Sequence, residues 1–178
     1  MSADVVNVVV VGLGGQGVLK AADILAEAAF AAGLDVKKAE VHGMSQRGGS
    51  VRSDVRFGPR VLSPMVPQGQ AHFLVALDAA QVEVNRAVLD PAAVVLTPEQ
   101  IDAAWLKSPR CLNIAMIGAL SAHLSLPVER FTAALRANLP EAAHPANLAA
   151  FDLGRAIGCS GGTGFPACGP AGNDPTTG

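Results

Sequence analysis

An apolar run followed by closely spaced glycines constrains this chain more than any other feature. The stretch VVVVGLGGQGVLKAADIL runs from Val8 to Leu25 and contains the glycines of residues 12–17. Four consecutive valines suit a strand that is buried on both faces of a parallel sheet. The glycines allow a tight turn, and apolar residues then recur at helical spacing. The segment therefore predicts a strand, a loop and a helix in succession.

The rest of the pattern predicts an α/β fold of the Rossmann-like type, a three-layer sandwich with a mostly parallel sheet flanked by helices. The first helix ends at Gly33, and residues 34–41 supply the second strand of a βαβ unit. Residues 51–58 alternate apolar and charged side chains, which is typical of a half-exposed edge strand. Further strands are expected at 71–78 and 93–97, and helices at 79–89, 98–106, 113–126, 127–138 and 146–157.

Length and charge narrow the class of protein. The chain has 178 residues, half of them hydrophobic, which is enough for one domain with a sizeable core. The net charge of −2 gives no basic surplus for nucleic acid. The apolar stretch of residues 5–11 is too short to span a membrane. We expect a soluble, cytoplasmic protein.

The domain is expected to end near residue 157. Residues 158–178 are rich in glycine and proline and are predicted to form a flexible tail. The chain has three cysteines, whereas an iron–sulfur cluster usually takes four thiolates. Its four histidines are scattered. We therefore expect no metal site.

The glycine loop by itself leaves three interpretations open. It matches G-x-G-x-x-G, which places backbone N–H groups and a helix N-terminus where a phosphate can bind. One interpretation is an NAD or FAD site, with Glu40 as the acid that holds a ribose. A second is another phosphate-bearing ligand. A third is structural, because glycines also allow a tight turn beneath a packed helix.

A second polar loop, HGMSQRGGS, spans residues 42–50. Loops that follow adjacent parallel strands meet at the same edge of a sheet, so we expect this loop to lie beside the glycine loop. Arg47 is suited to hold a phosphate or carboxylate with its forked guanidinium. Alternatively, the segment is a surface turn in which Arg47 pairs with a nearby acid.

Two motifs together resemble a known family. GLGGQGV (residues 12–18) and GMSQRGGSVRSDVRFG (residues 43–58) resemble the gamma-type subunits of the 2-oxoacid:ferredoxin oxidoreductases, especially the small subunits of the indolepyruvate branch. LNIAMIGAL (residues 112–120) is similar to a later segment of that family. The resemblance covers residues 5–157.

The resemblance implies a division of labour between subunits. Such enzymes convert a 2-oxoacid and coenzyme A to an acyl-CoA and carbon dioxide, and they reduce ferredoxin or another acceptor. Thiamine diphosphate and [4Fe-4S] clusters are expected on a large partner subunit, and coenzyme A is expected as a co-substrate near this chain. The chain itself would hold no cofactor alone and would carry no catalytic residue.

The resemblance also assigns binding roles residue by residue. The matching positions are Gly12, Gly14, Gly15, Gln16, Gly17, Met44, Ser45, Gln46, Arg47, Gly48, Gly49 and Asn113. The second loop reads G-M-S-Q-R-G-G, which favours the aryl-pyruvate branch over the pyruvate branch with its G-P-x-x-R-G-G. Asn113 has an alternative role as the N-cap of the following helix.

Two other functions stay open at this point. The chain would bind a dinucleotide by itself if it were a self-contained NAD(P)-dependent oxidoreductase, and Glu40 would then be needed. It would be a scaffold if its loops only shaped an interface, and Arg47 would then not affect coenzyme A binding.

Overall fold

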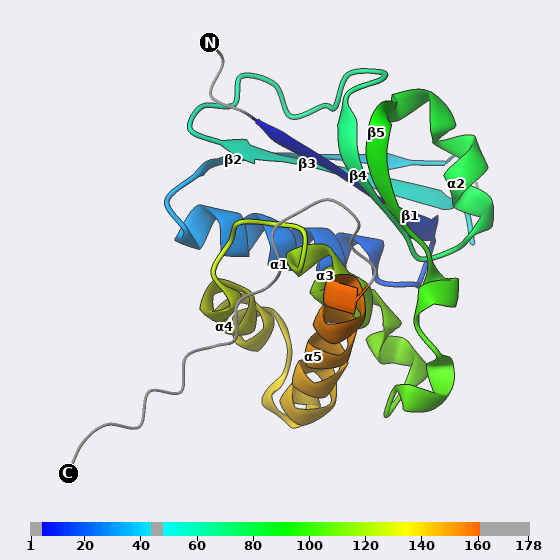
Figure 1. The fold of residues 1–178 in the computed structure, drawn as a ribbon, viewed down its shortest axis with the longest axis vertical. Helices are drawn as coiled ribbons and strands as arrows, with labels where there is room; N and C mark the ends of the chain where they lie inside the picture. The colour runs from blue at the N-terminus through cyan, green and yellow to red at the C-terminus, as the bar shows by residue number, and fades with distance from the viewer. Residues whose placement is uncertain (1–4, 44–47, 161–178) are drawn as a thin grey trace.

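The computed structural model describes residues 5–43 and 48–160, which form a sheet with helices packed on it (Figure 1). Within these residues the sheet has five strands in the order β2-β3-β1-β4-β5. The strands are β1 (Val6–Leu13), β2 (Asp35–His42), β3 (Ser50–Gly58), β4 (Ala71–Ala76) and β5 (Leu89–Leu96). The helices are α1 (Val18–Ala31), α2 (Ala80–Val84), α3 (Leu112–Ser121), α4 (Val128–Asn138) and α5 (His144–Ser160).

The position of β3 corrects the predicted topology. β3 runs antiparallel to both β1 and β2 and lies between them, while β4 and β5 continue the sheet parallel to β1. The first two strands of the predicted βαβ unit therefore point the same way but are not neighbours. The prediction of an edge strand at residues 51–58 was wrong, since β2 occupies that edge.

The predicted fold class is confirmed, with two unequal outer layers. α1 packs on β2 and β3, α3 packs on β4 and β5, and α4 and α5 pack against these two helices. Figure 1 shows all four helices on one side of the sheet. The opposite face is covered by α2, by the short 3-10 turn η1 (Arg86–Val88) and by residues 59–70, which we call the covering segment.

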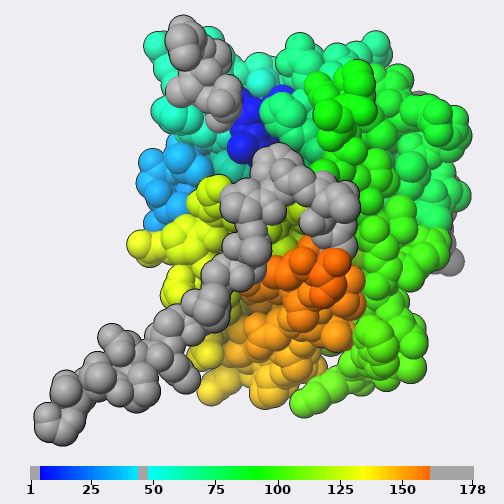
Figure 2. Space-filling model, viewed as in Figure 1, coloured from blue at the N-terminus to red at the C-terminus, as the bar shows by residue number. Residues whose placement is uncertain are grey.

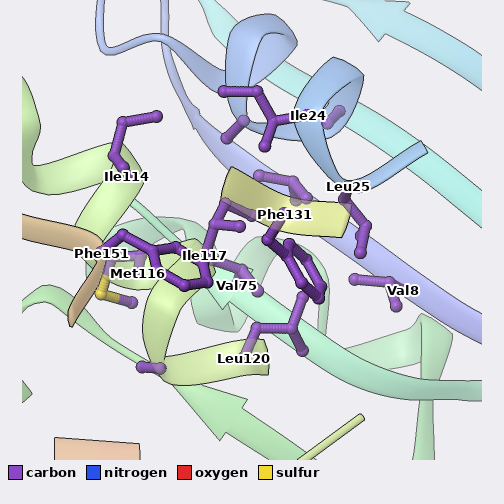
Figure 3. Packing of buried hydrophobic residues seen from close by; sticks show 14 of the residues in the cluster. Val8, Ile24, Leu25, Val75, Ile114, Met116, Ile117, Leu120, Phe131 and Phe151 are labelled. Atoms are coloured by element: carbon purple, nitrogen blue, oxygen red, sulfur yellow. The ribbon is translucent and has the colours of Figure 1, made fainter. Parts of the chain in front are cut away.

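The main core lies between the sheet and the four helices (Figure 3). Phe131 of α4 and Phe151 of α5 are fully buried, and their ring centroids lie 5.6 Å apart. α3 and α5 approach closely because glycines of the two helices lie at their contact. A Cβ on Gly154 would lie 1.8 Å from the carbonyl oxygen of Ala115. This packing holds α3, which carries Asn113 of the candidate site, against α5.

Buried charges explain why β3 looked exposed in the sequence. Asp54 is fully buried, and its carboxylate accepts hydrogen bonds from Arg52 Nε at 2.6 Å and from the Val66 N–H at 2.9 Å. Arg56 donates to Asn7 Oδ1 at 2.8 Å and to two carbonyl oxygens of the covering segment. The alternating charges thus bind the covering segment to the sheet instead of facing solvent.

Several helices are shorter than predicted. α2 ends at Val84 and is followed by η1, and α3 ends at Ser121. The predicted helix at 98–106 is instead two 3-10 turns, η2 (Pro98–Gln100) and η3 (Ala103–Trp105). Asp102 Oδ1 accepts the Ala104 N–H at 2.9 Å, and such a local bond competes with a continuous helix. Figure 2 shows this green segment beside the orange α5.

α5 extends to Ser160, three residues past the expected end of the domain, and Gly158 is buried against Ala119. The predicted tail beyond that point lies outside the described residues. In the part of the chain that the structure describes, no helix is long and apolar enough to cross a membrane.

The buried carboxylate on β3 generates the first prediction. Replacing Asp54 by alanine should lower the free energy of unfolding by about 2–4 kcal/mol, because Arg52 is left without its buried partner. Urea denaturation of the full chain measures this. Asp152→Ala, which removes an exposed aspartate from α5, is the control and should change the free energy by less than about 0.5 kcal/mol. Equal effects of the two variants would contradict this account of β3.

Candidate functional site

The two predicted loops meet at the carboxyl edge of the sheet. Leu13, the last residue of β1, lies opposite Ser50, the first residue of β3. The Gly14 N–H donates to the Gly49 carbonyl oxygen at 3.0 Å, and the Gly43 N–H donates to the Ser50 carbonyl oxygen at 2.8 Å. The expected proximity is therefore confirmed, although its cause is the antiparallel β1–β3 pairing and not adjacent parallel strands.

The glycine loop is stabilised largely by its own groups. Gln16 folds back so that its Oε1 accepts the Leu13 N–H at 2.7 Å, and its own N–H donates to the Leu13 carbonyl oxygen at 3.1 Å. A Cβ on Gly12 would lie 2.8 Å from Gln16 Oε1, so glycine there makes room for this side chain. The N–H groups of Leu13, Gly14 and Gln16 are thus used inside the protein.

Asn113 holds the other end of the glycine loop. Its side chain is 8% exposed, and its Nδ2 donates to the Gly17 carbonyl oxygen at 3.2 Å. Gly17 has a φ of 83°, and a Cβ there would lie 2.4 Å from Asn113 Nδ2. The alternative N-cap role was wrong, since Cys111 precedes α3 as its N-cap and Asn113 is the second helical residue.

The remaining predicted site residues divide into two groups. Gly15 and Gly48 have φ values of 93° and 64°, which favour glycine. Met44, Ser45, Gln46 and Arg47 lie outside the described residues, so their predicted roles stay predictions.

Two hollows flank the glycine loop and share Gly15 and Gly17. The α3-side hollow has a volume of about 420 Å³ and is lined by Gly15, Gln16, Gly17, Leu77, Pro109, Arg110, Leu112 and Asn113. The β2-side hollow has a volume of about 560 Å³, and its lining includes Lys20, Asp23 and His42. A third hollow of about 670 Å³ lies at the opposite edge of the sheet and includes none of the predicted site residues.

The α3-side hollow is suited to an anion. Gly17, the N-cap residue of α1, and the first two residues of α3 border it, and helix N-termini carry partial positive charge. Arg110 adds a full positive charge from the 3-10 turn η4 (Pro109–Cys111). The hollow also lies beyond the carboxyl ends of β1 and β4, where the connections leave to opposite faces of the sheet and where open α/β sheets commonly bind ligands.

Sequence reasoning missed Arg110, although a signal was present. Ser108 Oγ accepts the Arg110 N–H at 3.3 Å, and Pro109 follows Ser108. Serine followed by proline is a common helix start. An arginine just after that start, two residues before the first leucine of LNIAMIGAL, marked a cation next to a helix N-terminus.

Glu40 does not fit a dinucleotide site. It lies on β2, and β3 separates it from β1, which puts it two strand spacings or about 9–10 Å away. Its Oε1 accepts a hydrogen bond from Lys38 Nζ at 2.8 Å, and its Oε2 lies 3.5 Å from His42 Nε2. The hydrogen bond from Lys38 lowers the pKa of Glu40. The NAD interpretation thus loses its predicted ribose ligand.

Comparison with known proteins decides the family. The model for pyruvate ferredoxin/flavodoxin oxidoreductase matches residues 7–102 and 99–157. The chain belongs to this family. It is 31% identical to the indolepyruvate oxidoreductase subunit IorB of Pyrococcus horikoshii over 83% of this chain and 93% of that protein. It is 53% identical to the Archaeoglobus fulgidus IorB over a shorter stretch, 42% of this chain and 37% of that protein.

Solved structures agree in fold. A keto/oxoacid ferredoxin oxidoreductase gamma subunit from Geobacter sulfurreducens superposes with a TM-score of 0.68 at 24% identity, over 87% of this chain and 99% of that chain. The 2-oxoglutarate:ferredoxin oxidoreductase of Magnetococcus marinus gives a TM-score of 0.78 at 21% identity. The match covers 93% of this chain but only 32% of that longer polypeptide. The predicted resemblance to gamma-type subunits is confirmed.

The contact between Gly17 and Asn113 generates the second prediction. Gly15→Ala places a side chain at positive φ with no atom within 4 Å, and should cost about 1–2 kcal/mol of folding stability. Gly17→Ala should cost clearly more, because its Cβ also collides with Asn113. Thermal denaturation of the two variants measures the difference, and adding Asn113→Ala to Gly17→Ala should recover part of the loss. Equal costs for the two single variants would contradict the contact.

Proposed function

We propose that this chain is the small subunit of an enzyme that oxidatively decarboxylates an aryl 2-oxoacid, with indolepyruvate as the model substrate. In the reaction, the bond between the carboxylate and the carbonyl carbon breaks and releases carbon dioxide. A thioester forms with coenzyme A, and two electrons pass to ferredoxin or a similar acceptor. The names of the IorB relatives support this substrate class.

The positively charged α3-side hollow is the observation that carries the proposal. Coenzyme A carries phosphates that suit two helix N-termini and Arg110, and its pantetheine arm has methyl and methylene groups that suit Leu77, Pro109 and Leu112. The Magnetococcus marinus enzyme is described with coenzyme A and succinyl-CoA bound, which supports this choice of ligand. Arg47, on the adjoining second loop, is proposed as a further phosphate ligand.

The chemistry of electron transfer is assigned to the partner subunit. Thiamine diphosphate would supply the carbanion chemistry there, and iron–sulfur clusters would carry the electrons. This chain has three cysteines, and among its described residues no three His, Cys, Asp or Glu side chains gather into a metal site. Its own residues would bind and orient coenzyme A and keep water from the reacting thioester.

Purification of the complex tests the assembly. The chain, isolated from its native host under anaerobic conditions, should bring along a large partner, brown iron–sulfur absorbance and bound thiamine diphosphate. Mass spectrometry and the visible spectrum measure this. A colourless chain recovered alone and carrying a dinucleotide would refute the proposal.

The charge at the hollow generates a sharper prediction. In the complex, Arg110→Ala should raise the KM for coenzyme A about tenfold and leave kcat within about twofold, because a charge-assisted hydrogen bond to phosphate is lost. Lys107→Ala removes an exposed cation from the same segment and is the matched control. Unchanged KM values in both Arg110→Ala and Arg47→Ala would instead favour a scaffold role for the loops.

A further inference from the structure

A buried glutamine contacts the base of the second loop, which we define as Gly43, Gly49 and Ser50. It comes from the face of the sheet opposite the four helices. Ser50 Oγ donates to Gln81 Oε1 at 2.5 Å, across 31 residues of sequence. Gln81 belongs to α2 and is 7% exposed. Gln81 lies outside the motifs that resemble the family, and neither Ser50 nor Gln81 lines the α3-side hollow.

This hydrogen bond completes a set of three at the base of the second loop. The two others are the backbone bonds from Gly43 to Ser50 and from Gly14 to Gly49. They join the loop to itself and to the glycine loop. The Ser50–Gln81 bond is different in kind, because a side chain from a separate element makes it. It connects Ser50, and the neighbouring Gly49 that binds the glycine loop, to α2.

Gln81 is itself held firmly. Its N–H donates to the Asp78 carbonyl oxygen at 3.0 Å, directly beyond β4. Its carbonyl oxygen accepts from Asn85 Nδ2 at 2.8 Å, and Asn85 is also buried. The side-chain amide of Gln81 is therefore presented from a fixed backbone, and it can hold Ser50 without first becoming ordered.

We propose that Gln81 is a positioning residue that, through Ser50 and Gly49, holds the glycine loop in the arrangement that binds coenzyme A. The inference rests on the function proposed above. Its physical basis is preorganisation: a loop that is held in place before binding loses less conformational entropy when the ligand arrives. Gln81 would act on affinity without touching the ligand.

Amide hydrogen exchange on the full chain tests the holding role without any ligand. Gln81→Leu keeps a buried side chain of similar size but removes the acceptor for Ser50. The Gly43 and Gly14 amides should then exchange about threefold faster or more, the range expected for loss of one neutral hydrogen bond. Ser50→Ala should do the same, Ser50→Thr should retain the protection, and Gln68→Leu, at an exposed glutamine, should leave it unchanged.

Coenzyme A kinetics of the complex test the consequence for binding. Gln81→Leu and Ser50→Ala should each raise the KM for coenzyme A about three- to tenfold with kcat within about twofold, and the double variant should be no worse than either. A purely structural role would lower thermal stability and the amount of active enzyme without moving KM.

The outcomes separate the two proposals. If the wild-type complex binds no coenzyme A, the proposed function fails, whatever the exchange data give. If wild type binds coenzyme A but Gln81→Leu changes neither exchange at Gly43 and Gly14 nor KM, the positioning role is overturned. If Ser50→Thr behaves like Ser50→Ala, the hydroxyl is not the link, and the positioning role is again overturned.

Discussion

Leu13 at the end of β1 faces Ser50 at the start of β3, and this antiparallel register underlies the whole candidate site. It places the glycine loop and the end of the second loop side by side, where Gly14 and Gly49 share a hydrogen bond. It also moves β2 to the edge of the sheet. The same pairing therefore creates the two-loop site and removes Glu40 from it.

β3 can lie between β2 and β1 only because its charged side chains have partners. A strand with Arg52, Asp54 and Arg56 on one face would be costly to bury unless each charge found a partner. Arg52 and Asp54 pair with each other, and the covering segment and Asn7 provide the other partners through the Val66 N–H and several carbonyl and amide oxygens. The charged positions of the motif VRSDVRFG, which resembles the family, are thus explained by packing of the far face.

The candidate site is made of main chain that other elements hold in place. Asn113 from α3 holds the glycine loop, and Gln81 from α2 holds the base of the second loop. α3 is in turn fixed by its close glycine-mediated packing on α5. These contacts restrict the glycine loop at Gly14 and Gly17, which lowers the entropy that binding of a ligand at the candidate site would cost.

The sequence by itself determined the buried strand β1, the turn at the glycines, the helix that follows and the resemblance to one family. These features depend on local preferences and on short motifs, such as four consecutive valines and the positive φ that Gly17 adopts. The structure decided the strand order and the neighbours of each loop. Alternating charges on β3 predict an exposed face unless the covering segment is known to lie there. Arg110 and Gln81 join the site only through contacts between residues distant in sequence, and such contacts depend on how separate elements pack.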